Sequence, residues 1–221
     1  MNCAIGCAKR LRGCPTNRQP ETPPAHQTQI PNMENKMNKT LIIAAHPYLA
    51  QSAVNRRWLD ALHQHPERFT VHELYAAYPH GKIDIAAEQR LVDAHQALVL
   101  QFPVYWFNCP PLLKQWLDDV LTYGWAYGSQ GKALAGKKTA IAVSLGTPAA
   151  DYTRQGAVGY TVAEALRSFE LSLRYCQADY RPMFAFHTID SNAGYSEAAL
   201  QAIEQSAADY IAWLNQLTEA A

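Results

Sequence analysis

The sequence predicts an α/β protein built on a doubly wound, five-stranded parallel sheet in the order 2-1-3-4-5, with helices on both faces. Two observations support this class. Five short apolar runs alternate along the chain with longer segments of helical period. Each run stops at small or polar residues, as a buried parallel strand does. Strands that are separated by helices pair in parallel through right-handed crossovers.

The first half of the chain supplies two of the predicted strands. Residues 41–45 form a continuous apolar run, typical of a strand covered on both faces, which stops at His46. A helix is expected to begin near Ser52, because serine caps helices well and apolar residues follow at helical spacing. Residues 69–74 alternate and predict the second strand, and residues 85–94 predict the next helix.

The second half continues the alternation. Residues 97–102 predict the third buried strand, and residues 139–145 and 183–186 predict the fourth and fifth. Pro110 and Pro111 open a helix between them, since proline is tolerated in a first turn. Apolar residues at helical spacing mark two further helices, over 162–173 and 200–214.

The first 36 residues differ from the rest of the chain. Residues 15–31 are rich in Pro, Thr, Gln and Asn without an apolar period, so they cannot bury enough surface to become ordered. We expect residues 1–36 to be a disordered or non-native tail, and residues 37–221 to form one domain. The three cysteines of this tail lack the spacing of a metal site, so we expect free thiols and no bound metal.

Composition excludes several classes of protein. Lys and Arg together number 19, as do Asp and Glu, and this zero net charge disfavours a nucleic-acid-binding surface. The sequence has no apolar run as long as a membrane helix and no apolar stretch after its basic N-terminus, so we expect a soluble, cytoplasmic protein. The motifs of serine hydrolases, zinc proteases and Rossmann dinucleotide sites are absent.

Candidate binding residues follow three of the predicted strands. A doubly wound sheet binds ligands outside the carboxyl ends of its strands, where the strand order reverses. The first, third and fourth strands are central in the predicted order, so the loops after them should meet there. The candidate cofactor-binding residues of these loops are His46, Ser52, Val54 and Asn55, then Pro103, Val104, Tyr105, Trp106 and Phe107, and then Ser144, Leu145, Gly146 and Thr147.

This combination suits a flavin that carries a phosphate ester. A helix N-terminus attracts phosphate through its backbone N–H groups and dipole, with help from Ser52 and the imidazole of His46. The aromatic third loop is expected to lie along the flat ring, and the peptide N–H groups of Gly146 and Thr147 to face the ring's carbonyls and nitrogens. Each residue alone also has an ordinary structural interpretation, so only their joint occurrence favours a flavin site.

Four segments then resemble a known family. They are AHPY at 45–48, IDIAAEQ at 83–89, PPLLK at 110–114 and GWAYG at 124–128. They are similar to motifs of the NAD(P)H:quinone oxidoreductase family, and within it to the bacterial flavoprotein ancillary subunits of glutathione-gated potassium efflux systems. The similarity runs from about Leu41 to Phe186.

The resemblance implies a flavodoxin-like fold, a homodimer, bound FMN with FAD as the second choice, and NAD(P)H as co-substrate for two-electron quinone reduction. It further implies roles for particular residues. These are His46 and Ser52 as flavin contacts, residues 103–107 along the ring, Trp125 and Tyr127 in the substrate pocket of the partner subunit, and Tyr152 as the catalytic tyrosine.

The sequence departs from the family at two places. Ser144-Leu145-Gly146-Thr147 replaces the common Thr-Thr-Gly-Gly, and Val158 stands where animal-type enzymes place a catalytic histidine. Our hypothesis is a flavin-dependent NAD(P)H dehydrogenase (quinone). The alternative is a regulatory ancillary subunit with secondary redox activity, held at the inner face of the membrane by a potassium-efflux protein. A flavodoxin-like electron carrier is disfavoured because such carriers are strongly acidic and this chain is neutral.

Overall fold

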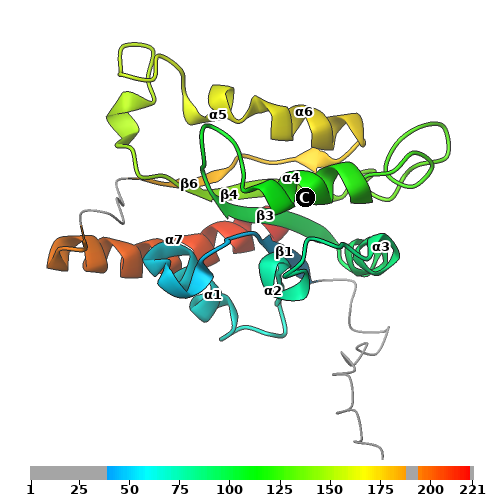
Figure 1. Cartoon of the computed structure of the whole chain (residues 1–221), viewed down its shortest axis with the longest axis horizontal. Helices are drawn as coiled ribbons and strands as arrows, with labels where there is room; N and C mark the ends of the chain where they lie inside the picture. The colour runs from blue at the N-terminus through cyan, green and yellow to red at the C-terminus, as the bar shows by residue number, and fades with distance from the viewer. Residues whose placement is uncertain (1–38, 188–193, 220–221) are drawn as a thin grey trace, which may run out of the picture. The chain divides into compact units, whose positions relative to one another are not determined.

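A parallel β-sheet with helices on both faces forms the described part of the protein (Figure 1). The computed structural model describes residues 39–187 and 194–219, and all of them belong to one unit, residues 32–221. The predictions for the tail 1–36, its disorder and its free thiols, fall outside the described residues.

The strands run in the order β2-β1-β3-β4-β5, which confirms the predicted topology. Every paired strand is parallel to its neighbour, and Thr40 lies opposite both Phe69 and Ala97. β1, β3 and β4 therefore end along the same edge of the sheet. The bounds of the four long strands are Thr40–Ala44 for β1, Phe69–Glu73 for β2, Ala97–Pro103 for β3 and Lys138–Ser144 for β4.

The position next to β4 holds two short strands where one was predicted. β5 (Asp179–Tyr180) pairs with the start of β4, and β6 (Phe184–Phe186) pairs with its end. Pro182 lies between them and has no N–H to donate to a neighbouring strand, so the pairing is interrupted there. The strand predicted over 183–186 is β6, and β5 is a sixth strand.

The described residues form seven α-helices and two short 3-10 helices, Leu49–Gln51 and Ala149–Asp151. The helix predicted over 162–173 is two helices, because Leu166 leaves the helical backbone angles (φ −104°, ψ 18°). No helix among the described residues is long and apolar enough to cross a membrane. The bounds are Ala53–Leu62 for α1, Leu74–Ala77 for α2, Ile85–Asp93 for α3, Pro111–Val120 for α4, Val162–Ala165 for α5, Arg167–Tyr175 for α6 and Glu197–Glu219 for α7.

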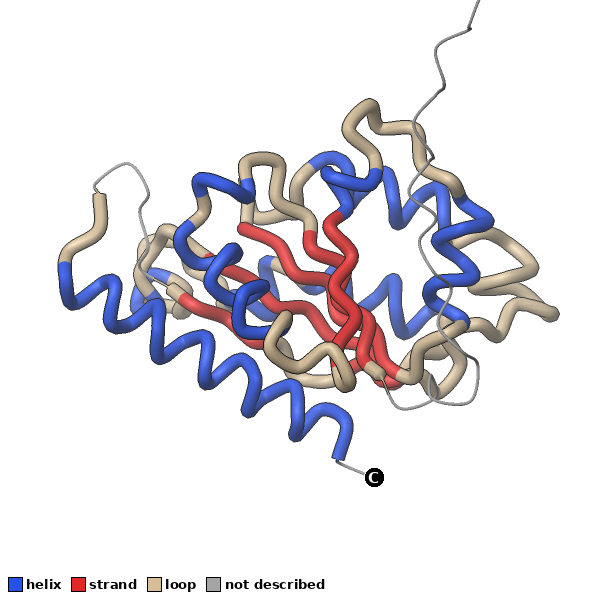
Figure 2. Tube along the Cα trace, turned by 90° about the horizontal axis from the view of Figure 1, so that it is seen from below, coloured by secondary structure: helices blue, strands red, loops and turns tan. Residues whose placement is uncertain are grey.

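Each central strand is buried on both faces. Leu41 and Ile43 pack with α3, α4 and α6 on one side, and Ile42 and Ala44 pack with α1 and α7 on the other. Figure 2 shows α7 as the long helix that lies alongside the strands and leads to the C-terminus. All five residues of β1 are buried, which confirms the prediction of a strand covered on both faces.

One buried carboxylate joins the elements on the first side. Glu88 of α3 is only 1% exposed, and its Oε1 lies 2.9 Å from His72 Nε2 of β2. The Tyr78 hydroxyl donates to the same oxygen at 2.6 Å, and the Trp116 indole donates to Oε2 at 2.7 Å. Burial alone raises the pKa of Glu88, but the interactions with His72, Tyr78 and Trp116 leave it below its usual value.

Replacing Trp116 by Phe should therefore destabilise the fold through Glu88. The matched control is Trp58→Phe, because Trp58 is also fully buried and donates to the neutral hydroxyl of Ser206 at 2.9 Å. Since bonds to charged acceptors contribute more, we expect Trp116→Phe to lower the free energy of unfolding by about 1 kcal/mol more than the control. Urea unfolding measures both values, and equal losses would contradict this account.

Candidate functional site

The loops after β1, β3 and β4 enclose a cavity of about 560 Å³ at the carboxyl edge of the sheet. Ten of the 13 predicted cofactor-binding residues line this strand-end cavity, and Trp106, Phe107 and Thr147 do not. The lining residues are His46, Tyr48, Gln51, Ser52, Val54, Asn55, Pro103, Val104, Tyr105, Ser144, Leu145, Gly146 and Tyr195.

The N-terminus of α1 forms one wall of the cavity. Ser52 caps the helix as predicted, because its Oγ accepts from the backbone N–H of Asn55 at 3.1 Å. Among the described residues, the N–H groups of Ala53 and Val54 have no protein acceptor. Free N–H groups at the start of a helix are a site for an anion such as phosphate.

His46 stands beside this helix end as a neutral donor. Its Nδ1 accepts from the backbone N–H of Tyr48 at 3.1 Å, so the neutral ring carries its proton on Nε2. Burial lowers the pKa of His46 to about 4, because desolvation disfavours the charged ring. His46 therefore offers a hydrogen bond at neutral pH, and the positive charge at this wall comes from the helix dipole.

The third loop folds back on itself in a two-residue hairpin. The backbone N–H groups of Tyr105 and Asn108 donate to each other's carbonyls at 2.8 and 2.9 Å. Trp106 and Phe107 both have positive φ, 48° and 58°, as in a type I′ turn. This turn directs Trp106 to the surface, where it is 94% exposed, while Pro103, Val104 and Tyr105 line the cavity.

The fourth loop keeps two peptide donors available. The Val104 N–H donates to the Ser144 carbonyl and the Leu145 N–H donates to the Phe186 carbonyl, each at 2.9 Å. Among the described residues, the N–H groups of Gly146 and Thr147 have no protein acceptor. Of these two predicted donors, Gly146 lines the cavity and Thr147 is the next residue along the chain.

The three residues assigned by resemblance alone lie outside the cavity lining. Tyr152 is buried, and its ring packs on Phe107 with ring centroids 6.4 Å apart. Burial raises the pKa of Tyr152, so its hydroxyl keeps its proton at neutral pH. The half-buried Trp125 indole donates to Asp93 at 3.2 Å, and Tyr127 packs on other tyrosine rings.

Three lining residues were not among the predicted cofactor-binding residues. Tyr48 and Gln51 belong to the loop after β1, and the predicted position of that loop was the signal that could have identified them. Tyr195 comes from the segment just before α7. No motif in the sequence marks Tyr195, because only the packing of α7 on the sheet brings this segment to the cavity.

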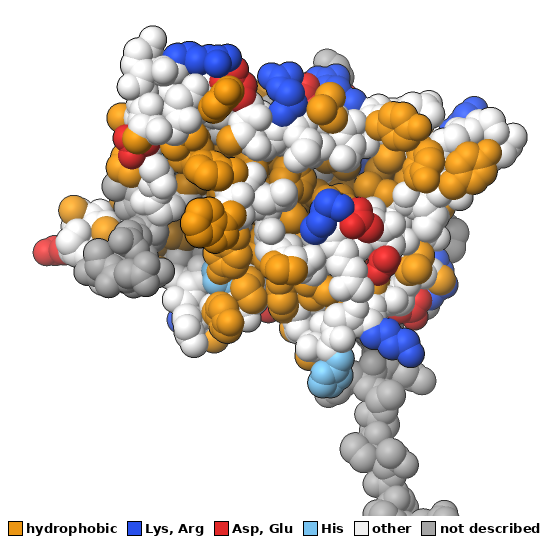
Figure 3. Space-filling view, turned by 45° about the horizontal axis from the view of Figure 1, so that its top comes forward, with side chains coloured by type: hydrophobic (Ala, Val, Ile, Leu, Met, Phe, Trp, Pro, Cys, Tyr) orange, Lys and Arg blue, Asp and Glu red, His pale blue; other side chains and the backbone are white. Residues whose placement is uncertain are grey.

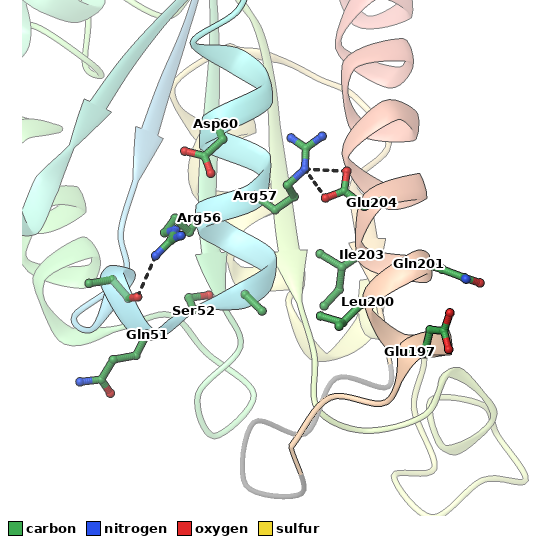
Figure 4. Close-up of a pocket in the computed structure, with 12 residues that line it drawn as sticks. Gln51, Ser52, Arg56, Arg57, Asp60, Glu197, Leu200, Gln201, Ile203 and Glu204 are labelled. Carbon is green, nitrogen blue, oxygen red and sulfur yellow. Dashed lines mark hydrogen bonds and ion pairs between the residues drawn. The ribbon is translucent and has the colours of Figure 1, made fainter.

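A second hollow of about 640 Å³ lies between the starts of α1 and α7 and shares Gln51 and Ser52 with the cavity (Figure 4). Arg57 of its charged wall is paired, because Arg57 Nε donates to both carboxylate oxygens of Glu204 at 2.7 and 2.8 Å, and Arg56 donates to the Ala50 carbonyl. Asp60 and Glu197 add negative charge, which disfavours a phosphate there. The strand-end cavity is therefore the better anion site.

Comparison with known families and proteins agrees with this geometry. The family Flavodoxin_2, described as having a flavodoxin-like fold, matches residues 38–214. The uncharacterized NAD(P)H oxidoreductase YrkL of Bacillus subtilis (strain 168) is 45% identical over 146 residues, covering 66% of this chain and 83% of YrkL. The glutathione-regulated potassium-efflux system ancillary protein KefG of Serratia proteamaculans (strain 568) is 42% identical over 149 residues, covering 67% and 81%.

Two solved structures are also similar. The general stress protein 14 of Treponema denticola, in complex with FMN, is 66% identical, with a TM-score of 0.77 and coverage of 81% of this chain and 99% of that one. An NADPH-quinone reductase from P. pentosaceus is 31% identical, with a TM-score of 0.67 and coverage of 78% and 96%.

The neutral state of His46 predicts a pH effect on stability. The unfolded chain takes up a proton at this position near pH 6.5, whereas the folded chain resists it until about pH 4. Because the unfolded state binds more protons between these values, the stability that His46 contributes is complete above about pH 6.5 and is lost as the pH falls toward 4.

The comparison variant is His46→Asn, whose Oδ1 takes the place of Nδ1 as the acceptor for the Tyr48 N–H but does not titrate. We expect the free energy of unfolding of the wild type to fall more steeply between pH 7 and pH 5 than that of the variant. Urea unfolding without added ligand measures both slopes. Parallel slopes would show that His46 is not held neutral by burial.

Proposed function

Because the chain belongs to the flavodoxin-like family of NAD(P)H oxidoreductases, we propose that it binds FMN in the strand-end cavity and reduces quinone-type acceptors. In the net reaction, NAD(P)H gives a hydride and the solvent gives a proton, so that a quinone becomes a hydroquinone and NAD(P)⁺ is released. When bound, FMN supplies the two-electron chemistry that protein side chains lack. The FMN of the Treponema protein and the name of the P. pentosaceus enzyme support this assignment.

The observation that carries the proposal is the set of unpaired donors on the cavity wall. Val54 and His46 line the cavity, and Ala53 lies between the lining residues Ser52 and Val54. The Ala53 and Val54 N–H groups and His46 Nε2–H have no acceptor among the described residues, so they suit a phosphate group at this end. The Ser52 hydroxyl adds a fourth donor at the same end. A dipole and neutral donors bind a dianion without requiring a buried cation.

The third and fourth loops would hold the flavin ring. Tyr105 and Gly146 line the cavity, and Thr147 follows Gly146. The ring would lie against Tyr105, and the peptide N–H groups of Gly146 and Thr147 would donate to its oxygens and nitrogens. Hydrogen-bond donors aimed at the ring stabilise the negative charge that reduction places there. The free donors of the fourth loop and the turn of the third loop support these roles.

Tyr152 is proposed as the proton-holding catalytic residue. Its pKa is raised by burial, so the hydroxyl remains a hydrogen-bond donor over the physiological pH range. Its contact with Phe107 places it behind the third loop, beside the exposed aromatic hairpin. A donor at this position would stabilise the developing negative charge of a quinone oxygen.

We further propose a homodimer in which Trp125 and Tyr127 enter the substrate pocket of the partner. The support is a set of exposed aromatic side chains, among them Tyr48, Trp106 and Tyr123. Figure 3 shows apolar side chains gathered across one face of the molecule. Patches of this kind mark interaction sites on soluble proteins.

A second candidate function follows from the KefG relatives, which are about as similar to this chain as YrkL. In this alternative the protein is an ancillary subunit of a potassium-efflux system, and its redox activity is secondary. A cytoplasmic protein held at the membrane by its partner would fit this role. Co-purification with a membrane potassium-efflux protein would favour it.

An anaerobic redox titration tests the main proposal. Protein purified with FMN should show visible flavin absorbance that bleaches on adding NADPH and returns on adding a quinone. Tyr152→Phe should keep the absorbance and the bleaching but slow reoxidation by the quinone at least about tenfold. A colourless protein that takes up no flavin would contradict the proposal, and unchanged reoxidation in Tyr152→Phe would remove that residue's role.

Subunit mixing tests the shared active site. If Tyr152 and the partner's Trp125 act at one site, the Tyr152→Phe and Trp125→Ala proteins should each be impaired. After random exchange of subunits between the two proteins, about a quarter of all active sites should contain both native residues and regain activity. Steady-state quinone reduction before and after mixing measures the recovery. No recovery in mixtures that contain heterodimers would mean that Trp125 serves its own subunit.

A further inference from the structure

A buried glutamine lies at the centre of the sheet, beneath the strand-end cavity. Gln101 of β3 is only 1% exposed, and its neighbours across the sheet are Ala44 of β1 and Ala142 of β4. These two alanines belong to the apolar cluster under α1 and α7, and their small side chains leave room for an amide. A buried amide is costly unless it is hydrogen-bonded, so its partners are informative.

Within the described part of the chain, the Gln101 side chain bonds only to Asn55, at the start of α1. Its Nε2 donates to the Asn55 backbone carbonyl at 3.4 Å and to Asn55 Oδ1 at 3.3 Å. Asn55 Nδ2 then donates to Ser144 Oγ at 2.9 Å and to Ser52 Oγ at 3.4 Å. The chain of bonds therefore begins in the core and ends on two serines that line the cavity.

The order of donors along this chain is fixed from its buried end. A backbone carbonyl only accepts, so the amide group of Gln101 that faces it must be the NH₂. The Gln101 NH₂ also donates to the Asn55 side chain, so the Asn55 Oδ1 must face Gln101. The Asn55 NH₂ then points toward Ser52 and Ser144. Each serine oxygen thus accepts from Asn55, and the hydroxyl proton of each serine is left to donate to a ligand in the cavity.

We propose that Gln101 is a positioning residue for the cofactor site, which directs the Ser52 and Ser144 hydroxyl protons toward a bound flavin phosphate and its polar chain. This inference rests on the proposed FMN site. Gln101 does not line the cavity and acts only through Asn55. Its Oε1 has no partner among the described residues, so this amide is not a fully satisfied structural contact.

Removing the donor from Gln101 should weaken cofactor binding without comparable damage to the fold. Gln101→Met keeps the length of the side chain and removes its NH₂, so Asn55 is free to turn its oxygen toward the serines and take up their protons. We expect the Kd for FMN to rise about tenfold, the effect of one hydrogen bond. Fluorescence titration of the apoprotein with FMN measures the Kd.

The matched control is Thr40→Val, which removes a buried hydroxyl without a partner among the described residues, at the opposite end of the sheet. It should leave the Kd for FMN unchanged. Asn55→Ala should weaken FMN binding, and adding Gln101→Met to it should weaken binding no further, because Gln101 acts through Asn55. Additive losses would overturn the proposal, as would equal losses in Gln101→Met and Thr40→Val.

A second variant keeps the test valid if Gln101→Met folds poorly. In Gln101→Glu, the protonated acid can donate and the carboxylate cannot, so FMN affinity relative to wild type should fall as the pH rises. A ratio that is independent of pH would overturn the proposal if Gln101→Glu binds FMN as weakly as Gln101→Met, because a buried carboxyl that stays protonated keeps its donor. If the wild-type apoprotein binds no FMN at all, the proposed function is refuted. If the wild type binds FMN and Gln101→Met binds it with the same Kd, only this inference is refuted.

Discussion

The meeting of the α1 N-terminus with the carboxyl ends of β1, β3 and β4 is the constraint on which the site depends. Parallel pairing in register brings the three strand ends to one edge of the sheet. The short loop between β1 and α1 places Ser52 and the free N–H groups at the same edge. The resulting wall is positive because of the helix dipole and not because of a cation. His46, neutral through burial, adds a donor without adding charge.

The two faces of the sheet bury polar groups in different ways. On one face Glu88 is surrounded by His72, Tyr78 and Trp116, so its carboxylate is fully engaged and joins β2, α2, α3 and α4. On the other face Gln101 makes weaker bonds and leaves one oxygen without a partner among the described residues. The first arrangement stabilises the fold, while the second extends toward the cavity.

Most elements and most of the cavity could be predicted from the sequence, because continuous apolar runs and helical spacing determine which segments are buried. β5 was missed since it has two residues and exists only through pairing with β4. The outward turn of Trp106 was missed because no glycine signals the positive φ in the third loop. Tyr195 reaches the cavity only through the packing of α7, and Gln101 was hidden inside an apolar run.

The measurement that tests the central claim most directly compares FMN with riboflavin, which lacks the phosphate. Fluorescence titration of the apoprotein at neutral pH gives both affinities. If the α1 N-terminus and His46 hold the phosphate, FMN should bind on the order of a hundredfold more tightly than riboflavin. Equal affinities would show that the phosphate is not bound at the helix end, and would contradict this account of the site.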